Sequence, residues 1–492
     1  MRYPATALCM VVIIQGCASL RPYPESILSA EGSMCLHWLE KIESTLEKYD
    51  LKDSGTVHLE GFPQLRVNRF LASMADQTVS RDTFGEWLEL MRDLDLTGKK
   101  FELANLPASA RQEVIQTPIT GSFEQALEYC GKSLNRISAN NAVHRQLLLE
   151  QAQVPDAYQS WKRVVGLYPL ARYFAGIGIK RLHRELNASF QMPTDQLPLQ
   201  GKLIRYNPPQ SPQLAPGHFA AMLRQAYDNP LKIPRLSSLQ LQQLFTQFAP
   251  LWEIDTRNNS DKLGIVNLTN SKQPQIDINK PAVYVKYDYA HWHGKVLLQL
   301  IYQIWLPARV KTGVLDLYGG ALDSVIWRVT LSPEGTPIAF DSIHGCGCYY
   351  MLFPGQGYRL ARLEDGAEPV LSPKAISTIP SHHRIVLRLQ SRTHYLQNLL
   401  LVNNTVAKTT ISYQFIDLDS LRSLPMSNGT RQSLYGEEGI IDASARAERL
   451  LLWPYGVASP GAMRQWGTHA IAFIGKRHFD DPFLFENLLD LE

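Results

Sequence analysis

The sequence has 492 residues, with 49 Lys and Arg against 46 Asp and Glu and a formal net charge of +3. Apolar residues make up 45% and charged residues 19%, which excludes a disordered or collagen-like chain. The near balance of charge argues against a dedicated nucleic-acid-binding protein, because such proteins concentrate basic side chains on one surface.

The N-terminal residues have the pattern of an export signal. Arg2 is the only charged residue before Arg21, and an apolar run extends from Ala5 to Ile14. This run is too short to cross a bilayer as a helix, which needs about 20 residues. Its length is typical of the hydrophobic part of a secretory signal peptide, so the sequence predicts an exported protein.

The apolar run ends in Ile14-Gln15-Gly16-Cys17, which resembles the lipobox of bacterial lipoprotein precursors. The resemblance implies cleavage before Cys17, fatty acylation of its thiol with chains such as palmitate, and acylation of the new amino group. Two or more acyl chains hold a protein firmly at a membrane. Ala18 stands where lipoproteins retained at the inner membrane carry Asp, which implies the periplasmic face of the outer membrane. The alternatives are an ordinary signal peptide with an incidental Cys17, or a buried N-terminal strand.

The first half of the chain has helical periodicity. Leu36, Leu39, Ile42 and Leu46 recur at three- and four-residue steps, as on the buried face of an amphipathic helix. The sequence Ser122-Phe-Glu-Gln125 matches a capping box, so a helix is expected to begin there. Prolines then interrupt any long helix until about residue 280.

From Ala282 the period changes to two, which predicts an antiparallel β region. Its expected strands are the segment around Val283–Tyr289, then Val296–Leu306, Val325–Leu331, Ile338–Phe353, Arg384–Gln390, Thr410–Ile416 and Thr468–Ile474. The predicted class is therefore α+β, a helical domain followed by a β sandwich or curved sheet. The expected organisation is a signal peptide at 1–16, an anchor and stiff spacer at 17–32, a helical domain at 33–190, a Pro-rich connector at 191–280 and a β-rich domain at 281–492.

The segment His344-Gly-Cys346-Gly-Cys348 concentrates unusual chemistry. Alternate residues of a strand share one face, and a second pair, His291 and His293, lies in the same β region. Imidazole and thiolate are the ligands that zinc and copper prefer in proteins. If the two segments meet, the sequence predicts a zinc or copper site made of His291, His293, His344, Cys346 and Cys348.

A structural interpretation of the cysteines stays open. Once Cys17 is lipidated, Cys35, Cys130, Cys346 and Cys348 remain, and in an oxidising compartment they allow three disulfide pairings. A Cys35–Cys130 disulfide would connect two parts of the helical domain, whereas a Cys346–Cys348 disulfide would close a strained, reducible loop. In this interpretation His291 and His293 are residues of a hairpin turn.

A catalytic thiol is the enzyme alternative. Ser342-Ile-His-Gly-Cys346 resembles the Ser-His-Gly-Cys signature of L,D-transpeptidases, envelope enzymes that remodel peptidoglycan. The resemblance implies that Cys346 is a nucleophile activated by His293, the histidine of an upstream His-Gly pair. This sequence inserts Ile343 into the signature and carries Cys348 where the family has Arg.

These features give three functional hypotheses. The first is a lipid-anchored bacterial cell-envelope protein of undetermined activity with a His/Cys metal site. The second is a thiol-dependent peptidoglycan-remodelling enzyme, and the third is a non-catalytic structural or assembly lipoprotein. The expected partners are the membrane, through the lipid anchor, and an envelope protein or peptidoglycan, but no nucleic acid.

Overall fold

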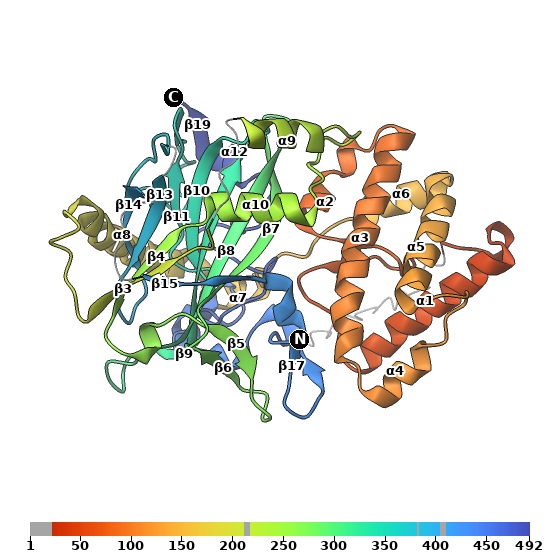
Figure 1. Ribbon diagram of the computed structural model, residues 1–492, viewed down its shortest axis with the longest axis horizontal. Helices are drawn as coiled ribbons and strands as arrows, with labels where there is room; N and C mark the ends of the chain where they lie inside the picture. Colours follow the sequence, from red (N-terminus) through yellow and green to blue (C-terminus); the bar gives the residue numbers. More distant parts are fainter. Residues whose placement is uncertain (1–21, 211–216, 381–382, 404–409) are drawn as a thin grey trace, which may run out of the picture.

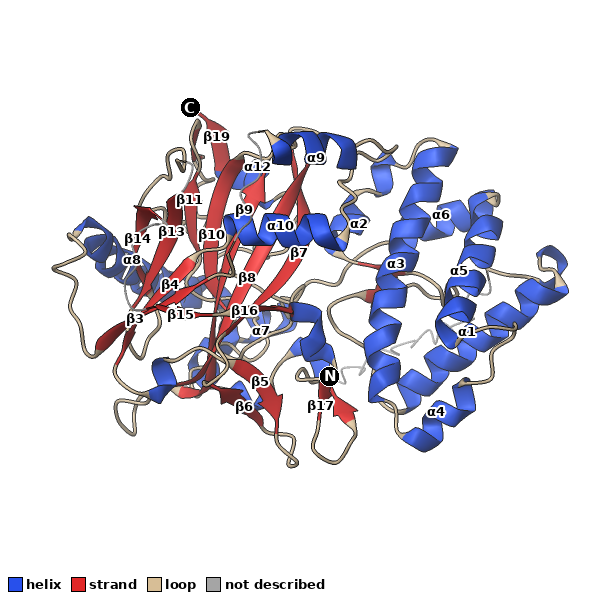
Figure 2. Cartoon of the chain, viewed as in Figure 1, coloured by secondary structure: helices blue, strands red, loops and turns tan. Residues whose placement is uncertain are grey.

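The computed structural model describes residues 22–210, 217–380, 383–403 and 410–492 (Figure 1). The α+β class predicted from the sequence is confirmed: helices gather in the N-terminal part and sheets in the C-terminal part (Figure 2). The lipobox and Cys17 lie outside the described residues. Within the described ranges, no helix is both long enough and apolar enough to span a membrane.

The helical part packs three long helices with shorter ones at their ends (Figure 1). These helices are α1 (Ala30–Lys48), α2 (Arg69–Ser73), α3 (Arg81–Asn105), α4 (Ala108–Val114), α5 (Phe123–Ala139) and α6 (Ala142–Gln151). The expected capping box is present at the start of α5, where Ser122 Oγ accepts from the Gln125 N–H and the Gln125 side chain accepts from the Ser122 N–H. The stripe from Leu36 to Leu46 is buried in α1.

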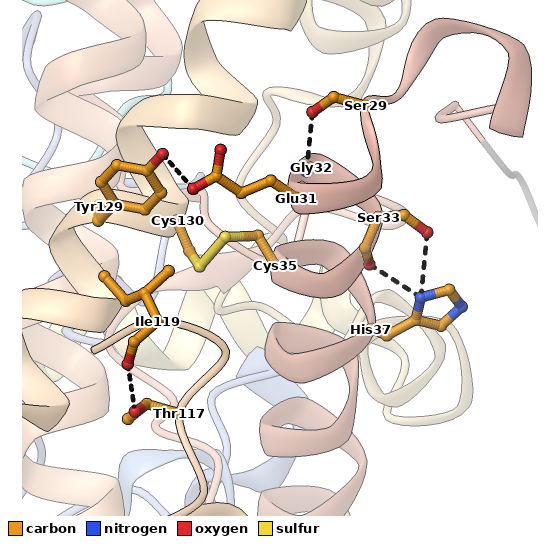
Figure 3. The surroundings of a disulfide bond; sticks show 10 residues. All are labelled: Ser29, Glu31, Gly32, Ser33, Cys35, His37, Thr117, Ile119, Tyr129 and Cys130. Atoms are coloured by element: carbon orange, nitrogen blue, oxygen red, sulfur yellow. Dashed lines mark hydrogen bonds between the residues drawn. A yellow bond between two sulfur atoms is a disulfide. The ribbon is translucent and has the colours of Figure 1, made fainter. Parts of the chain in front are cut away.

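A disulfide joins Cys35 of α1 to Cys130 of α5 in the core of this part (Figure 3). This is one of the pairings that the sequence allowed. Beside it, the Tyr129 hydroxyl donates to Glu31 at 2.5 Å, so a second contact joins the same two helices. The bridge closes a long stretch of chain, because 95 positions separate the two cysteines.

The expected spacer is packed into the helical part from Pro22 onward. Tyr23 is buried, its hydroxyl is hydrogen-bonded to Ser138 at 2.7 Å, and Gln64 donates to the same oxygen at 2.7 Å. The His144 ring is hydrogen-bonded to the Pro22 carbonyl.

Two large sheets and several two-stranded ones form the described β part. The six-stranded sheet contains, in order, β11 (Met351–Pro354), β10 (Pro337–His344), β9 (Gly320–Leu331), β8 (Lys295–Arg309), β7 (Ala282–Trp292) and β16 (Gln414–Asp417). Strands β7 to β11 form an antiparallel meander, and β16 pairs with β7 in parallel. The strand that the alternating pattern predicted around Val283–Tyr289 is therefore present as β7, the first strand of the meander.

The second sheet has five strands and mixed direction. Its order is β14 (Leu396–Asn403), β13 (His383–Leu389), β4 (Leu251–Thr256), β3 (Lys202–Asn207) and β15 (Thr410–Ser412). Strands β3 and β4 come from the region expected to be a connector, so that region contributes two central strands. It also supplies α9 (His218–Ala226), α10 (Ser238–Phe248) and the hairpin of β5 (Ile265–Leu268) and β6 (Pro274–Asp277).

Three further segments differ from the expectations. Helices α7 (Ser160–Val165) and α8 (Tyr168–Gln191) lie with the β part, where Ser189 donates to the Gln397 carbonyl on β14. The strand expected at Ile338–Phe353 breaks after His344 and resumes as β11. The segment Thr468–Ile474 is not a strand, and its only ladder contact among the described residues is an isolated bridge from Ala470 to His478.

Candidate functional site

The structure does not bring the expected metal ligands together. His291 pairs with Val296 at one end of β8, whereas His344 pairs through Val325 with Ile304 near the other end. Val296 and Ile304 are eight residues apart on β8, which is about 27 Å at ~3.4 Å per residue. Two ligands of one metal ion must lie much closer, because metal–ligand bonds are only about 2.0–2.3 Å. The expected five-ligand site is therefore not formed, and the described residues contain no group of three or more His, Cys, Asp or Glu that could hold a metal ion.

His293 follows the end of β7 and Cys346 follows the end of β10, at these same opposite ends of the sheet, so the expected catalytic pair is not assembled either. His293 has φ +45° and the following Gly294 φ +74°, which are the values of the two central residues of a tight hairpin turn between β7 and β8. The hairpin-turn interpretation of His293 therefore fits its geometry.

His291 connects the two parts of the molecule. Its Nε2 is hydrogen-bonded to Ser73 Oγ of α2 at 2.8 Å, and its ring stacks on Phe70 and Phe483. Burial lowers the pKa of His291 to about 4. The ring is therefore neutral at pH 7 and acts as a packing and hydrogen-bonding group.

His344 belongs to a buried chain of imidazoles and carboxylates. Its Nδ1 lies 3.4 Å from Asp323, whose other oxygen is hydrogen-bonded to His394 at 2.8 Å. His394 reaches Asp261 with its second nitrogen at 3.2 Å. Burial lowers the pKa of His344; burial also acts to lower that of His394, but hydrogen bonds to Asp261 and Asp323 leave the pKa of His394 raised. This network ties β9 and β10 to the loop before β14.

A cavity of about 760 Å³ lies between the helical part and the β part. Helix α3 lies on one side of it, and α10 and β7 lie on the other (Figure 1). Its apolar walls are formed by Phe70 of α2, Leu90 and Leu94 of α3, Leu241 and Phe245 of α10, and Phe415 of β16. The lining also carries ten charged side chains, so apolar walls and charged groups meet in one cavity. The volume lies in the range that is typical of ligand sites.

Ion pairs connect the two sides of this cleft. Arg422 donates to Asp53 at 2.8 Å, and Arg69 lies 3.1 Å from Asp480. On β7 itself, Lys286 Nζ donates to Asp419 at 2.7 Å. Burial acts to lower the pKa of Lys286, but the Asp419 carboxylate raises it above its usual value. Several of the charges that line the cleft therefore already have partners.

Two carboxyl groups in the cleft hold protons more tightly than usual. Asp288 accepts from the Trp466 indole N–H at 2.7 Å, and burial raises its pKa. Burial raises the pKa of Asp480 to about 6, in spite of Arg69. The Oδ1 atom of Asp480 is buried, and no other side chain of the described residues is hydrogen-bonded to it.

The edge of β7 runs along the cleft. Lys286 and Asp288 point to one face of the strand and Tyr287 and Tyr289 to the other, yet all four line the same cavity. Side chains from both faces can meet one cavity only if the strand presents its edge to it. The pairing with β16 stops at Val285, so no described strand pairs with this edge beyond that residue.

Backbone geometry defines which groups face the opening. The His291 N–H donates to the Pro482 carbonyl at 2.7 Å, so the backbone N–H and C=O of His291 point away from β8. The direction of these backbone groups alternates from residue to residue along an antiparallel strand. The backbone N–H and C=O of Tyr287 and Tyr289 therefore also point away from β8. The Tyr289 N–H is bonded to its neighbour Asp288. Among the described residues, nothing is hydrogen-bonded to the backbone N–H or C=O of Tyr287.

Sequence reasoning missed this cleft because its groups come from segments far apart in the chain. Asp53, Asp288, Asp419 and Asp480 have no common motif, and only the folded arrangement brings them to one cavity. The one sequence signal was the change to a period of two at β7, which predicted a strand but not its open edge. No protein-family model, curated protein or solved structure that was searched matches this chain.

Proposed function

We propose that this protein is a lipid-anchored component of the bacterial cell envelope that binds an extended peptide segment in the cleft beside β7. The open edge at Tyr287 carries the proposal. An extended peptide can add to such an edge as a further strand, with main-chain hydrogen bonds giving affinity and side-chain pockets giving specificity.

The walls of the cleft suit such a ligand. Leu90 and Leu94 stand on one side and Leu241 and Phe245 on the other, so apolar side chains at alternate peptide positions would be covered by α3 and α10. We therefore infer a ligand with alternating apolar residues.

Two observations support the envelope location. The Ile14-to-Cys17 sequence resembles a lipobox, and the chain carries a buried disulfide between Cys35 and Cys130, a bond that is typical of oxidising compartments. Five positions separate Cys17 from Pro22, which can span at most about 18 Å when extended. The anchor would hold the helical part close to the membrane surface.

Replacing Cys17 by Ser tests the anchor. We expect the variant to lose incorporation of labelled palmitate and to leave the membrane fraction, because no thiol remains for diacylation. Metabolic labelling followed by membrane fractionation measures both. A Cys9→Ser variant is the matched control and should keep both properties. Label retained by Cys17→Ser would contradict the lipobox interpretation.

Replacing Tyr287 by Pro tests the peptide site. Proline removes the outward N–H and places its ring at the edge, and such a change is tolerated where the N–H does not pair within the sheet. Binding of linear peptides selected from a random display library should weaken about tenfold or more, since one main-chain hydrogen bond and the approach of the peptide are lost. Fluorescence anisotropy of a labelled selected peptide gives the affinity.

Tyr287→Phe is the matched control, because it keeps the backbone N–H and the ring. It should bind the selected peptide within about twofold of the wild type. Thermal unfolding of both variants establishes that the fold is intact. A library that yields no peptide competing for the cleft, or equal binding by the folded Tyr287→Pro variant, would refute the proposal.

A further inference from the structure

The turn after β10 places two thiols side by side. Cys346 and Cys348 are both free, and each thiol shifts the pKa of the other. The turn is closed by the His344 N–H, which donates to the Cys348 carbonyl at 3.0 Å, and by the Gly347 N–H, which donates to the His344 carbonyl at 2.8 Å. The turn forms because β10 ends at His344.

Neighbouring segments hold this turn in place. Arg464 donates through its side chain to the Cys346 carbonyl at 3.1 Å and through its backbone to the Gly345 carbonyl at 2.9 Å. Gly347 has φ +89°, and a Cβ there would lie 2.4 Å from the Ala470 carbonyl oxygen, so only glycine fits. The proximity of the thiols is therefore built into the fold.

The two sulfur atoms differ in access. Cys346 is 5% exposed and lies in an apolar cluster with Trp305 and Met463, whereas Cys348 packs on that cluster and is half-buried. Solvent and small reactants reach Cys348 first. The charged groups that act on the pair are Arg446, Arg464 and Glu448.

We propose that Cys346 and Cys348 form a reversible dithiol–disulfide pair that exchanges with an external disulfide. The Cys348 thiolate attacks one sulfur of the external disulfide, whose S–S bond breaks, and the first thiolate leaves and takes up a proton. The Cys346 thiolate then attacks the Cys348 sulfur and releases the second thiol. Two protein thiols are oxidised to one disulfide, and one external disulfide is reduced to two thiols.

The contact between the thiols supports this sequence of steps. The hydrogen bond from Cys348 lowers the pKa of Cys346, and the same bond raises the pKa of Cys348, so the two groups titrate as a pair. Cys346 ionises more readily, so the half-buried Cys348 attacks after passing its proton to the Cys346 sulfur. The departing external thiolate takes that proton up and leaves Cys346 as the thiolate for the second step. Disulfides in small strained loops are more easily reduced than structural ones, which makes the exchange reversible.

The buried Cys35–Cys130 disulfide serves as an internal reference for how easily a disulfide of this protein is reduced. The test incubates the folded full-length protein with glutathione disulfide, traps remaining thiols with a maleimide under denaturing conditions, and analyses peptides by mass spectrometry. We expect the wild type to lose both free thiols and to gain a disulfide within the 346–348 segment. Dithiothreitol should reduce this bond at a concentration that leaves Cys35–Cys130 oxidised.

Single variants separate the two roles. Cys346→Ser should stop at a mixed disulfide, with one glutathionyl group on Cys348, whereas Cys348→Ser should leave Cys346 unmodified because it is buried. Near-ultraviolet circular dichroism checks the fold of each. The proposal is overturned if folded wild-type protein keeps both thiols free, or if it carries glutathione on both cysteines without an internal bond.

Discussion

Replacing Arg328 by Met is expected to destabilise the protein by about 3–5 kcal/mol, because it leaves a buried carboxylate without its partner. Arg328 and Asp341 are both fully buried in the middle of the six-stranded sheet. Two hydrogen bonds of 2.9 and 2.5 Å join them. The guanidinium also donates to the Phe479 carbonyl and lies 3.8 Å from the centre of the Phe479 ring.

The pH dependence gives this prediction a second readout. Burial raises the pKa of Asp341 above its usual value even beside Arg328. A carboxyl group whose folded-state pKa is raised contributes most stability below its unfolded pKa and loses it as pH rises. Without Arg328 the free energy of unfolding falls more steeply with pH. The difference in stability between the variant and the wild type should therefore widen from about pH 4 to pH 8. Urea unfolding at several pH values measures it.

The matched control is Arg181→Met, which removes an exposed i,i+4 ion pair with Glu185. Exposed pairs contribute about 0.2–1 kcal/mol at most, so this variant should unfold almost as the wild type does. A cost below about 1 kcal/mol for Arg328→Met would mean that Asp341 is not held as the structure places it.

Removing the Cys35–Cys130 disulfide by a double Ser substitution is expected to cost about 4–5 kcal/mol. The bond restricts the unfolded chain over a separation of 95 residues, and the entropic gain from closing a loop of that size is about 4.7 kcal/mol. Chemical unfolding monitored in the helical part measures the loss. The wild type under strong reduction should unfold at the same denaturant concentration as the variant.

A double Ser substitution at Cys346 and Cys348 is the matched control, because those thiols are free and close no long loop. It should change the free energy of unfolding by much less than the loss of Cys35–Cys130. Equal effects of the two double variants would show that the disulfide has no special part in stability.

Local patterns predicted much of the fold. The apolar stripe of α1, the capping box at Ser122 and the alternation along Val283–Tyr289 each follow from interactions between near neighbours in sequence. The expectation at Thr468–Ile474 was wrong because an alternating pattern does not supply a partner strand. The break after His344 depends on the contact of Gly347 with Ala470, which no local pattern contains.

The candidate sites were harder to predict. Val283–Leu306 was expected to be a hairpin, and an antiparallel meander from it places His291 and His344 at opposite ends of the sheet. The expected metal site required the two segments to meet, and strand direction prevents this. The proposed pairing of Cys346 with Cys348, which are free in the structure, needs only a local turn. The cleft needed the docking of Asp53 and Asp480 from the two parts, which is a tertiary property.

Amide hydrogen exchange at Tyr287 tests the peptide-binding proposal most directly. Exchange of the Tyr287 N–H should be fast in the free protein, because that group has no partner among the described residues. A peptide selected for binding should slow it at least tenfold, while the Tyr289 N–H, already bonded to Asp288, should change little. Unchanged exchange at Tyr287 with the bound peptide at saturation would contradict strand addition at β7.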